Sequence, residues 1–162
     1  LQGENILQDQ LIKTARLDTE ILMAKLLGVK REYVILNHDK NLDEKYLDYF
    51  KKLIQKRATR KPIAYLLKNK FFWNNKFFVS EDTLIPRPDT EIIIEQVLKF
   101  TKNKNKLSML DIGVGSGCIL LSILKERQNF HGTGIDISKN ALEILKINVR
   151  KIKLANKKKK KK

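Results

Sequence analysis

The sequence predicts an α/β fold in which a small helical domain and a β-hairpin precede part of an open parallel sheet. Residues 9–67 have apolar side chains at helical spacing, residues 71–79 indicate two aromatic strands around a turn, and apolar strands alternate with amphipathic helices from residue 107 onward. Such alternation is typical of parallel sheets, whose crossovers need a helix. We therefore expect a helical domain over 1–70, a hairpin and proline-rich linker over 71–88, an α/β part over 89–156, and a disordered lysine tail over 157–162.

The helical domain is expected to contain two well-marked helices. In the first, apolar residues recur at i, i+4 and i+5 spacing, and Gly28 can take the left-handed conformation that ends a helix. The second extends from about Asp43 to Arg57. The residues expected to face the core are Leu17, Ile21, Leu22, Leu26 and Leu27 in the first helix, and Tyr46, Leu47, Phe50 and Leu53 in the second.

The hairpin and the proline-rich segment follow. Residues 71–73 and 77–79 flank Asn74 and Asn75, which readily adopt left-handed φ and therefore suit a hairpin turn. The segment 84–91 (LIPRPDTE) then carries two prolines that stiffen the chain before a helix, with Asp89 or Thr90 as its cap. The apolar positions expected for that helix are Ile92, Ile93, Val97 and Leu98.

A glycine-rich segment, 110–120 (LDIGVGSGCIL), joins a strand to a helix. Residues 107–112 are expected to form a buried strand, and three alternate glycines then give a turn that lets the backbone approach a ligand closely. The helix from about Cys118 to Arg127 points its free N–H groups at that ligand. A glycine turn that binds nothing is the alternative.

A second strand, 132–137, carries Asp136 about 20 residues after the last glycine, a distance that suits hydrogen bonds to the ribose hydroxyls of an adenosine-containing cofactor. As an alternative, Asp136 caps the helix expected over 139–150, just before Ser138.

The glycine spacing also favours one cofactor over another. Dinucleotide-binding proteins use G-x-G-x-x-G, and a pyrophosphate is disfavoured beside a carboxylate. Here the spacing is G-x-G-x-G with Asp111 two residues before Gly113. S-adenosyl-L-methionine has no phosphate but carries an amino group and a sulfonium, both cationic, which a carboxylate favours. The motif D-x-G-x-G-x-G resembles motif I of the Rossmann-like class I methyltransferases. The cofactor-binding residues that we predict are Asp111, Gly113, Val114, Gly115, Ser116, Gly117 and Asp136.

The proline-rich segment followed by LDIGVGSGCI resembles the glutamine N5-methyltransferases of peptide-chain release factors. Residues 62–65 (PIAY) and 72–73 (FW) also stand where that family has similar residues, and the resemblance covers about 15–154. Lys68 and Phe71 depart from it, where glycine and glutamate are expected. The resemblance implies a cytoplasmic enzyme that methylates the glutamine amide in the Gly-Gly-Gln motif of release factors and recognises these partners through its helical domain.

The family's catalytic motif, Asn-Pro-Pro-Tyr, is absent. The three prolines are preceded by lysine, isoleucine and arginine, so we assign no catalytic residue and expect this chain to be an incomplete, inactive N-terminal portion. Three alternatives remain: a methyltransferase acting on an exocyclic amine of RNA or DNA bases, a non-catalytic cofactor- or RNA-binding fragment, and, least favoured, a dehydrogenase.

Composition adds weaker constraints. Six of the sixteen net positive charges come from the lysine tail, which would add nonspecific affinity for RNA. The single cysteine, Cys118, excludes a disulfide framework and fits a small core residue, with a reactive thiol as the alternative. His38 and His131 have no metal-ligand spacing, and no apolar stretch approaches the roughly 20 residues that cross a bilayer. We therefore expect neither a metal nor a membrane partner.

Two strands alone would leave one face of the sheet poorly covered and its edges open. We therefore expect weak or absent cofactor affinity, disorder beyond about Leu154, and a tendency to aggregate. In the helix over 139–150, the apolar side chains expected to stay partly exposed are Ala141, Leu142, Leu145 and Val149.

Overall fold

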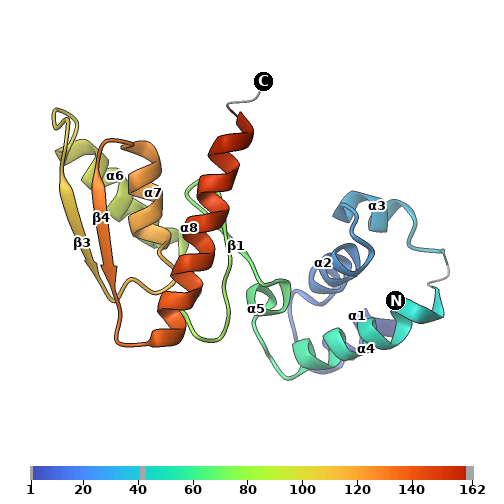
Figure 1. Cartoon of the computed structure of the whole chain (residues 1–162). Coiled ribbons are helices and arrows are strands. Elements are labelled where there is room, and N and C mark those ends of the chain that lie inside the picture. The colour runs from blue at the N-terminus through green and yellow to red at the C-terminus, as the bar shows by residue number, and fades with distance from the viewer. Residues whose placement is uncertain (1, 41–42, 160–162) are drawn as a thin grey trace. The chain divides into compact units, whose positions relative to one another are not determined.

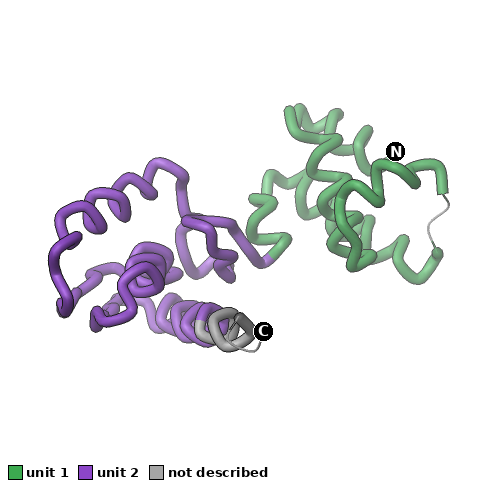
Figure 2. Tube along the Cα trace, turned by 90° about the horizontal axis from the view of Figure 1, so that it is seen from above, with its two compact units in different colours: residues 1–67 green, residues 68–162 purple. Residues whose placement is uncertain are grey.

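The computed structural model describes residues 2–40 and 43–159, with side chains described as far as Ile152. The chain divides into two compact units, Leu1–Leu67 and Lys68–Lys162 (Figure 2). Helices make up the first unit, and a hairpin, a parallel strand pair and further helices make up the second (Figure 1). The predicted α/β class, with a helical part ahead of an incomplete Rossmann-like domain, is confirmed.

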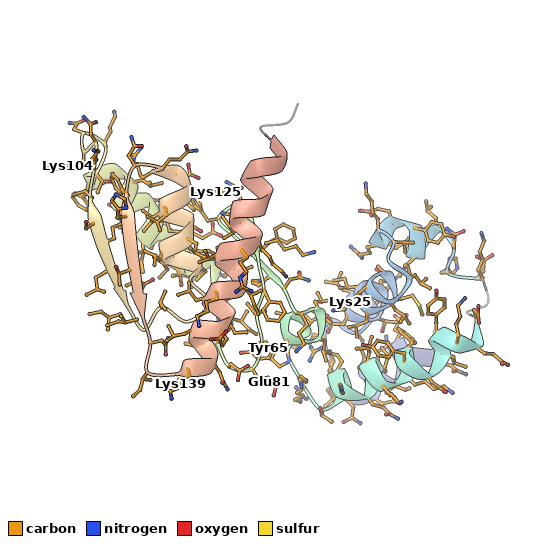
Figure 3. The ribbon with its side chains drawn as sticks, in the orientation of Figure 1. Lys25, Tyr65, Glu81, Lys104, Lys125 and Lys139 are labelled. Atoms are coloured by element: carbon orange, nitrogen blue, oxygen red, sulfur yellow. The ribbon has the colours of Figure 1, made fainter. Side chains whose placement is uncertain are left out.

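Unit 1 is a helical bundle built around α2. Its described helices are α1 (Gln2–Asp9), α2 (Ala15–Leu27), α3 (Arg31–Leu36), α4 (Glu44–Ala58) and α5 (Ile63–Leu67). Leu7, Leu22 and Ile54 are fully buried where α1, α2 and α4 meet. Lys25 of α2, labelled in Figure 3, donates from Nζ to the carbonyls of Leu66 and Leu67 at 3.0 and 2.8 Å and so stabilises the end of α5.

The predicted helix end at Gly28 is confirmed, because this residue lies in the left-handed region at φ +69°. The helical region begins earlier than expected, since α1 starts at Gln2 rather than near Asp9.

The predicted buried face of α2 is partly wrong. Leu17 is 38% exposed, whereas the charged residues Asp18 and Glu20 are buried. Glu20 accepts hydrogen bonds from Arg16 and Arg31 at 3.0 and 2.7 Å, and Asp18 accepts one from Arg57 at 2.7 Å. Because α2 contacts α1, α3, α4 and α5, it is covered on several sides, and paired carboxylates take places that apolar periodicity assigned to leucine.

The hairpin of unit 2 is present, but its turn lies one residue earlier than predicted. Strands β1 (Lys70–Phe72) and β2 (Asn75–Phe77) pair antiparallel, with Phe72 opposite Asn75. The turn residues are Trp73 and Asn74, at φ +44° and +57°, the combination of a type I′ turn. Asn75 is held in the strand because it is buried, its Nδ2 donates to the Trp73 carbonyl at 2.7 Å, and its Oδ1 accepts from Lys125.

Two parallel strands form the small sheet of unit 2. Strand β3 (Ser108–Ile112) pairs with β4 (His131–Ile135) so that Ser108 lies opposite His131 and Ile112 opposite Ile135. The remaining elements are η1 (Pro88–Thr90), α6 (Glu91–Phe100), α7 (Cys118–Glu126) and α8 (Lys139–Lys159). The hairpin belongs to this unit, because its buried side chains pack with α6 and α7. The fully or almost fully buried members of that core are Phe72, Phe77, Ile94 and Ile123.

The expectation of a buried strand at 107–112 is wrong for one face of the sheet. Leu110, Ile112 and Ile135 are 61%, 75% and 46% exposed, because no described element covers their face. The opposite face packs against α7. The expectation that two strands would leave one face poorly covered is therefore confirmed.

Two helix faces also differ from prediction. In α6, Ile94 is fully buried whereas Ile92 and Ile93 are 59% and 45% exposed, so the predicted face is wrong at its start. It is confirmed at Val97 and Leu98, which pack against the core. Thr90 makes no side-chain cap hydrogen bond, since a 3₁₀ turn leads the chain into α6 instead. In α8, Ala141 is buried rather than partly exposed, because this helix packs directly onto the glycine-rich loop. Leu142, Leu145 and Val149 are half-buried, as expected.

Half of the lysine tail lies outside the described residues. Helix α8 continues through Lys159, where a disordered segment was expected from Lys157, and Lys160–Lys162 lie outside the described residues. Within the described chain, no helix is both long and apolar enough to cross a membrane.

Candidate functional site

A cleft of about 390 Å³ lies where β3 and β4 end in unit 2. Its size is within the range of small-molecule sites, roughly 300–1,000 Å³. The glycine-rich loop, the end of β4 and the segment 82–87 line it. Of the predicted binding residues, those that line the cleft are Asp111, Gly113, Val114, Gly115, Ser116 and Asp136, whereas Gly117 does not line it. Carboxyl ends of parallel strands are the usual place for ligands in such sheets.

The three glycines of the loop all have left-handed φ, at +77° for Gly113, +52° for Gly115 and +77° for Gly117. A Cβ added to Gly113 would meet nothing within 4 Å, and one added to Gly115 would meet only the Gly113 carbonyl oxygen at 3.9 Å. A Cβ on Gly117 would lie 2.3 Å from Leu145 Cδ1. The first two glycines therefore leave room around the loop, and the third lets α8 pack against it.

Asp136 holds the loop by backbone hydrogen bonds. Its Oδ2 accepts from the Gly115 N–H at 2.9 Å, and its Oδ1 accepts from the Ser138 N–H at 2.9 Å. These two N–H groups, Ser138 first, lower the pKa of Asp136, so the carboxylate is ionised at neutral pH. Each oxygen keeps a lone pair for a further donor. The cap of α8 is Ser138, whose Oγ accepts from the Ala141 N–H at 3.2 Å, and not Asp136.

Asp111 is a second carboxyl group in the cleft, in a different environment. Burial raises its pKa; a backbone hydrogen bond at Leu120 opposes this effect, and the nearby charge of Asp136 adds to it. Asp82 also lines the cleft, and among the described lining residues Arg87 alone is cationic. Three carboxylates around one space favour a ligand with a cationic part.

Cys118 lines the cleft, and the two histidines belong to no metal-ligating group among the described residues. Burial raises the pKa of the Cys118 thiol, against a smaller opposing effect of a hydrogen bond with Ser116, which argues against a reactive thiol. The residue is partly buried and packs against the core of unit 2, as predicted. No group of histidine, cysteine, aspartate and glutamate residues in the described chain could hold a metal ion.

Sequence reasoning missed two contributions to the site. The segment 84–87 was used only as a family marker and a stiff linker, yet it lines the cleft. Asn148 of α8 is fully buried and donates to the carbonyl of Ser116 in the loop at 2.8 Å. A signal for Asn148 existed, because it is a polar residue at helical spacing from Ala141 and Ile144, both of which are buried.

Two family models match the chain. One, described as the PrmC N-terminal domain, matches residues 1–67, and the other, described as the methyltransferase small domain, matches residues 89–161.

Curated relatives match over nearly the whole chain. A release factor glutamine methyltransferase of Leptospira interrogans is 41% identical over 88% of this chain and 50% of the relative. One of Buchnera aphidicola is 39% identical over 90% of this chain and 52% of the relative. A bifunctional methyltransferase of Rickettsia bellii is 32% identical over 91% of this chain and 31% of the relative. The chain spans about half the length of the first two.

Proposed function

Because the chain belongs to the release factor glutamine methyltransferase family, we propose that its cleft binds S-adenosyl-L-methionine for methylation of a glutamine side-chain amide. The observation that carries this proposal is the cleft itself, in which left-handed glycines and two carboxylates, Asp111 and Asp136, surround one space at the ends of β3 and β4. The proposed substrate is the Gly-Gly-Gln motif of peptide-chain release factors. We place the reaction in the cytoplasm, where release factors act.

The chemistry of the lining residues fits this cofactor. Asp111 supplies a negative charge for the amino group and the sulfonium, and the free lone pairs of Asp136 suit two ribose hydroxyls. The open space at Gly113 and Gly115 lets a ligand lie against the backbone. The cofactor supplies an electrophilic methyl group. A pyrophosphate between Asp111 and Asp136 would be repelled, which argues against a dinucleotide.

The proposed substrate sets a demand that these residues do not meet. An amide nitrogen is a poor nucleophile because its lone pair is delocalised into the carbonyl, so the enzyme must orient it toward the methyl group. No asparagine precedes a proline in this sequence, and we assign the orienting role to none of its 162 residues. We assign the recognition of release factors to unit 1, on the strength of its match to the PrmC N-terminal domain. Contact with RNA through the lysine tail is an additional, nonspecific interaction.

The cofactor proposal can be tested with the chain labelled with ¹⁵N-glycine. The chain has seven glycines, three of them in the loop, while Gly3 and Gly28 lie in unit 1 and serve as internal references. S-adenosylmethionine should shift the loop signals and leave the references unchanged. Asp136→Ala should raise the Kd about tenfold or more, because charged hydrogen bonds are lost. Asp89→Ala, which removes an exposed carboxylate that does not line the cleft, should not change it.

Shifts with NADH but not with S-adenosylmethionine would refute the cofactor assignment. For the substrate, methyl transfer from labelled cofactor to a release factor should be absent with this chain alone and appear when the C-terminal half of the Leptospira relative is added. A release factor with glutamate in place of the motif glutamine is the control. Turnover by the 162-residue chain alone would show that its catalytic residues have been overlooked.

A further inference from the structure

Asn148 is the one fully buried asparagine among the described residues, and it lies in the middle of α8. All the hydrogen-bonding groups of its side chain are used. Its Oδ1 accepts from the Phe78 N–H at 2.6 Å, and its Nδ2 donates to the Phe78 carbonyl at 2.9 Å and to the Ser116 carbonyl at 2.8 Å. One side-chain amide therefore joins α8 to two segments that are distant in sequence.

The contact with Phe78 is paired like a strand contact. Phe78 directly follows β2, and its N–H and C=O both bond to the same amide, as they would to a neighbouring strand. The exit of the hairpin is thereby fixed to α8. The second amide hydrogen of Asn148 remains for the glycine-rich loop.

Ser116 lies between Gly115 and Gly117, two loop residues that are themselves held in place. Gly115 is held through its N–H by Asp136, and Gly117 packs against Leu145 of α8. The Ser116 carbonyl is the group that Asn148 holds. Two side chains therefore fix the loop, one just after β4 and one from α8.

We propose that Asn148 is a positioning residue for the cofactor site: it sets the orientation of the Ser116 peptide, and hence of the loop, and couples the loop to the exit of the hairpin. This inference rests on the proposed function for its effect on cofactor affinity, but its effect on the loop does not depend on any ligand. Asn148 does not line the cleft and acts only through Ser116.

The test is Asn148→Asp, which keeps the shape of the side chain but replaces its donor nitrogen by an oxygen. Both carbonyls then face a carboxylate oxygen, so the loop and the Phe78 segment should be released. In the ¹⁵N-glycine spectrum, the Gly115 and Gly117 signals should move or broaden without any ligand, while those of Gly3, Gly28 and Gly132 stay, since Gly132 faces α7 rather than the loop. The Kd for S-adenosylmethionine should rise at least tenfold.

The matched control is Asn140→Asp. Asn140 lies on the same helix and donates to Asp82 at 3.0 Å in an exposed position, so its substitution should leave the Gly115 and Gly117 signals in place. If Asn148→Asp does not fold, as judged by Trp73 fluorescence, Asn148→Ala gives the same comparison without a buried charge.

Unchanged Gly115 and Gly117 signals in a folded variant would overturn the inference. So would an equal change at Gly132, because it would show a general loss of structure in unit 2. If the unsubstituted chain binds no S-adenosylmethionine, the proposal that its cleft holds this cofactor fails, yet the glycine signals still decide the role of Asn148.

Discussion

Gly117 and Gly113 have the same φ of +77°, but their surroundings differ, and alanine at each should therefore destabilise unit 2 to different degrees. A left-handed conformation costs an L-residue about 1–2 kcal/mol. Alanine also restricts the unfolded chain, which offsets about 0.4–1 kcal/mol. Because a Cβ at Gly113 meets nothing within 4 Å, Gly113→Ala should lower the free energy of unfolding by only about 1 kcal/mol.

Gly117→Ala carries the same backbone penalty and a steric one. Its Cβ would lie 2.3 Å from Leu145 Cδ1 and 3.2 Å from Leu121 Cδ1, whereas carbon atoms in contact prefer about 3.5–4.0 Å. Leu145 must therefore move away from the loop, and such overpacking costs about 1–3 kcal/mol. The expected total loss for Gly117→Ala is about 2–4 kcal/mol.

A double-mutant cycle with Leu145→Ala isolates the steric part. In the Leu145→Ala background the shortest contact is removed and only the contact with Leu121 remains, so Gly117→Ala should cost at least about 1 kcal/mol less than in the unsubstituted chain. Urea unfolding followed by tryptophan fluorescence measures this in unit 2 alone, because the single tryptophan, Trp73, lies in its hairpin. Equal losses for the two glycines, or additive effects with Leu145→Ala, would refute the packing argument.

Two further predictions concern pH and backbone strain. Burial and the charge of Asp136 raise the pKa of Asp111, so on acidification Asp111 loses its charge above the ordinary aspartate range, while Asp136, with a lowered pKa, stays ionised. The affinity for S-adenosylmethionine should fall in that pH window. In a titration of Kd against pH, Asp111→Asn should abolish this step. Lys68, where the family resemblance leads us to expect glycine, has a left-handed φ of +59°. Lys68→Gly should therefore raise the free energy of unfolding, measured by urea, by about 0.5–1 kcal/mol. Lys70→Gly, in strand β1, should lower it.

Features set by neighbouring residues were predictable from the sequence. The helix end at Gly28, the left-handed loop glycines and the gathering of Asp111 and Asp136 at one edge of the sheet all follow from local conformation and strand periodicity. The Lys68 position is also informative, because the chain keeps the left-handed conformation there without glycine.

Features set by distant contacts were not predictable. The hairpin turn falls on Trp73 because its N–H donates to Glu91 at 2.9 Å and its indole Nε1–H donates to Glu126 at 3.0 Å, while Lys125 holds Asn75. These partners are 18 to 53 residues away from Trp73 and Asn75 in sequence. Turn propensity alone favoured the asparagine pair, and the tertiary contacts outweighed it.

The buried polar side chains are the features that hydrophobic periodicity predicts least well. Asp18 and Glu20 of α2 and Asn148 of α8 all occupy positions that periodicity would give to apolar residues. The two carboxylates pair with arginine side chains, and such pairs can form wherever charges meet inside a bundle. Asn148 instead bonds only to backbone groups. A change of side chain at Ser116 leaves its carbonyl in place, and at Phe78 only proline would remove the N–H. At Phe78 the neutral amide of Asn148 bonds to the backbone as a neighbouring strand would. At Ser116 it fixes the backbone of a residue that lines the cleft.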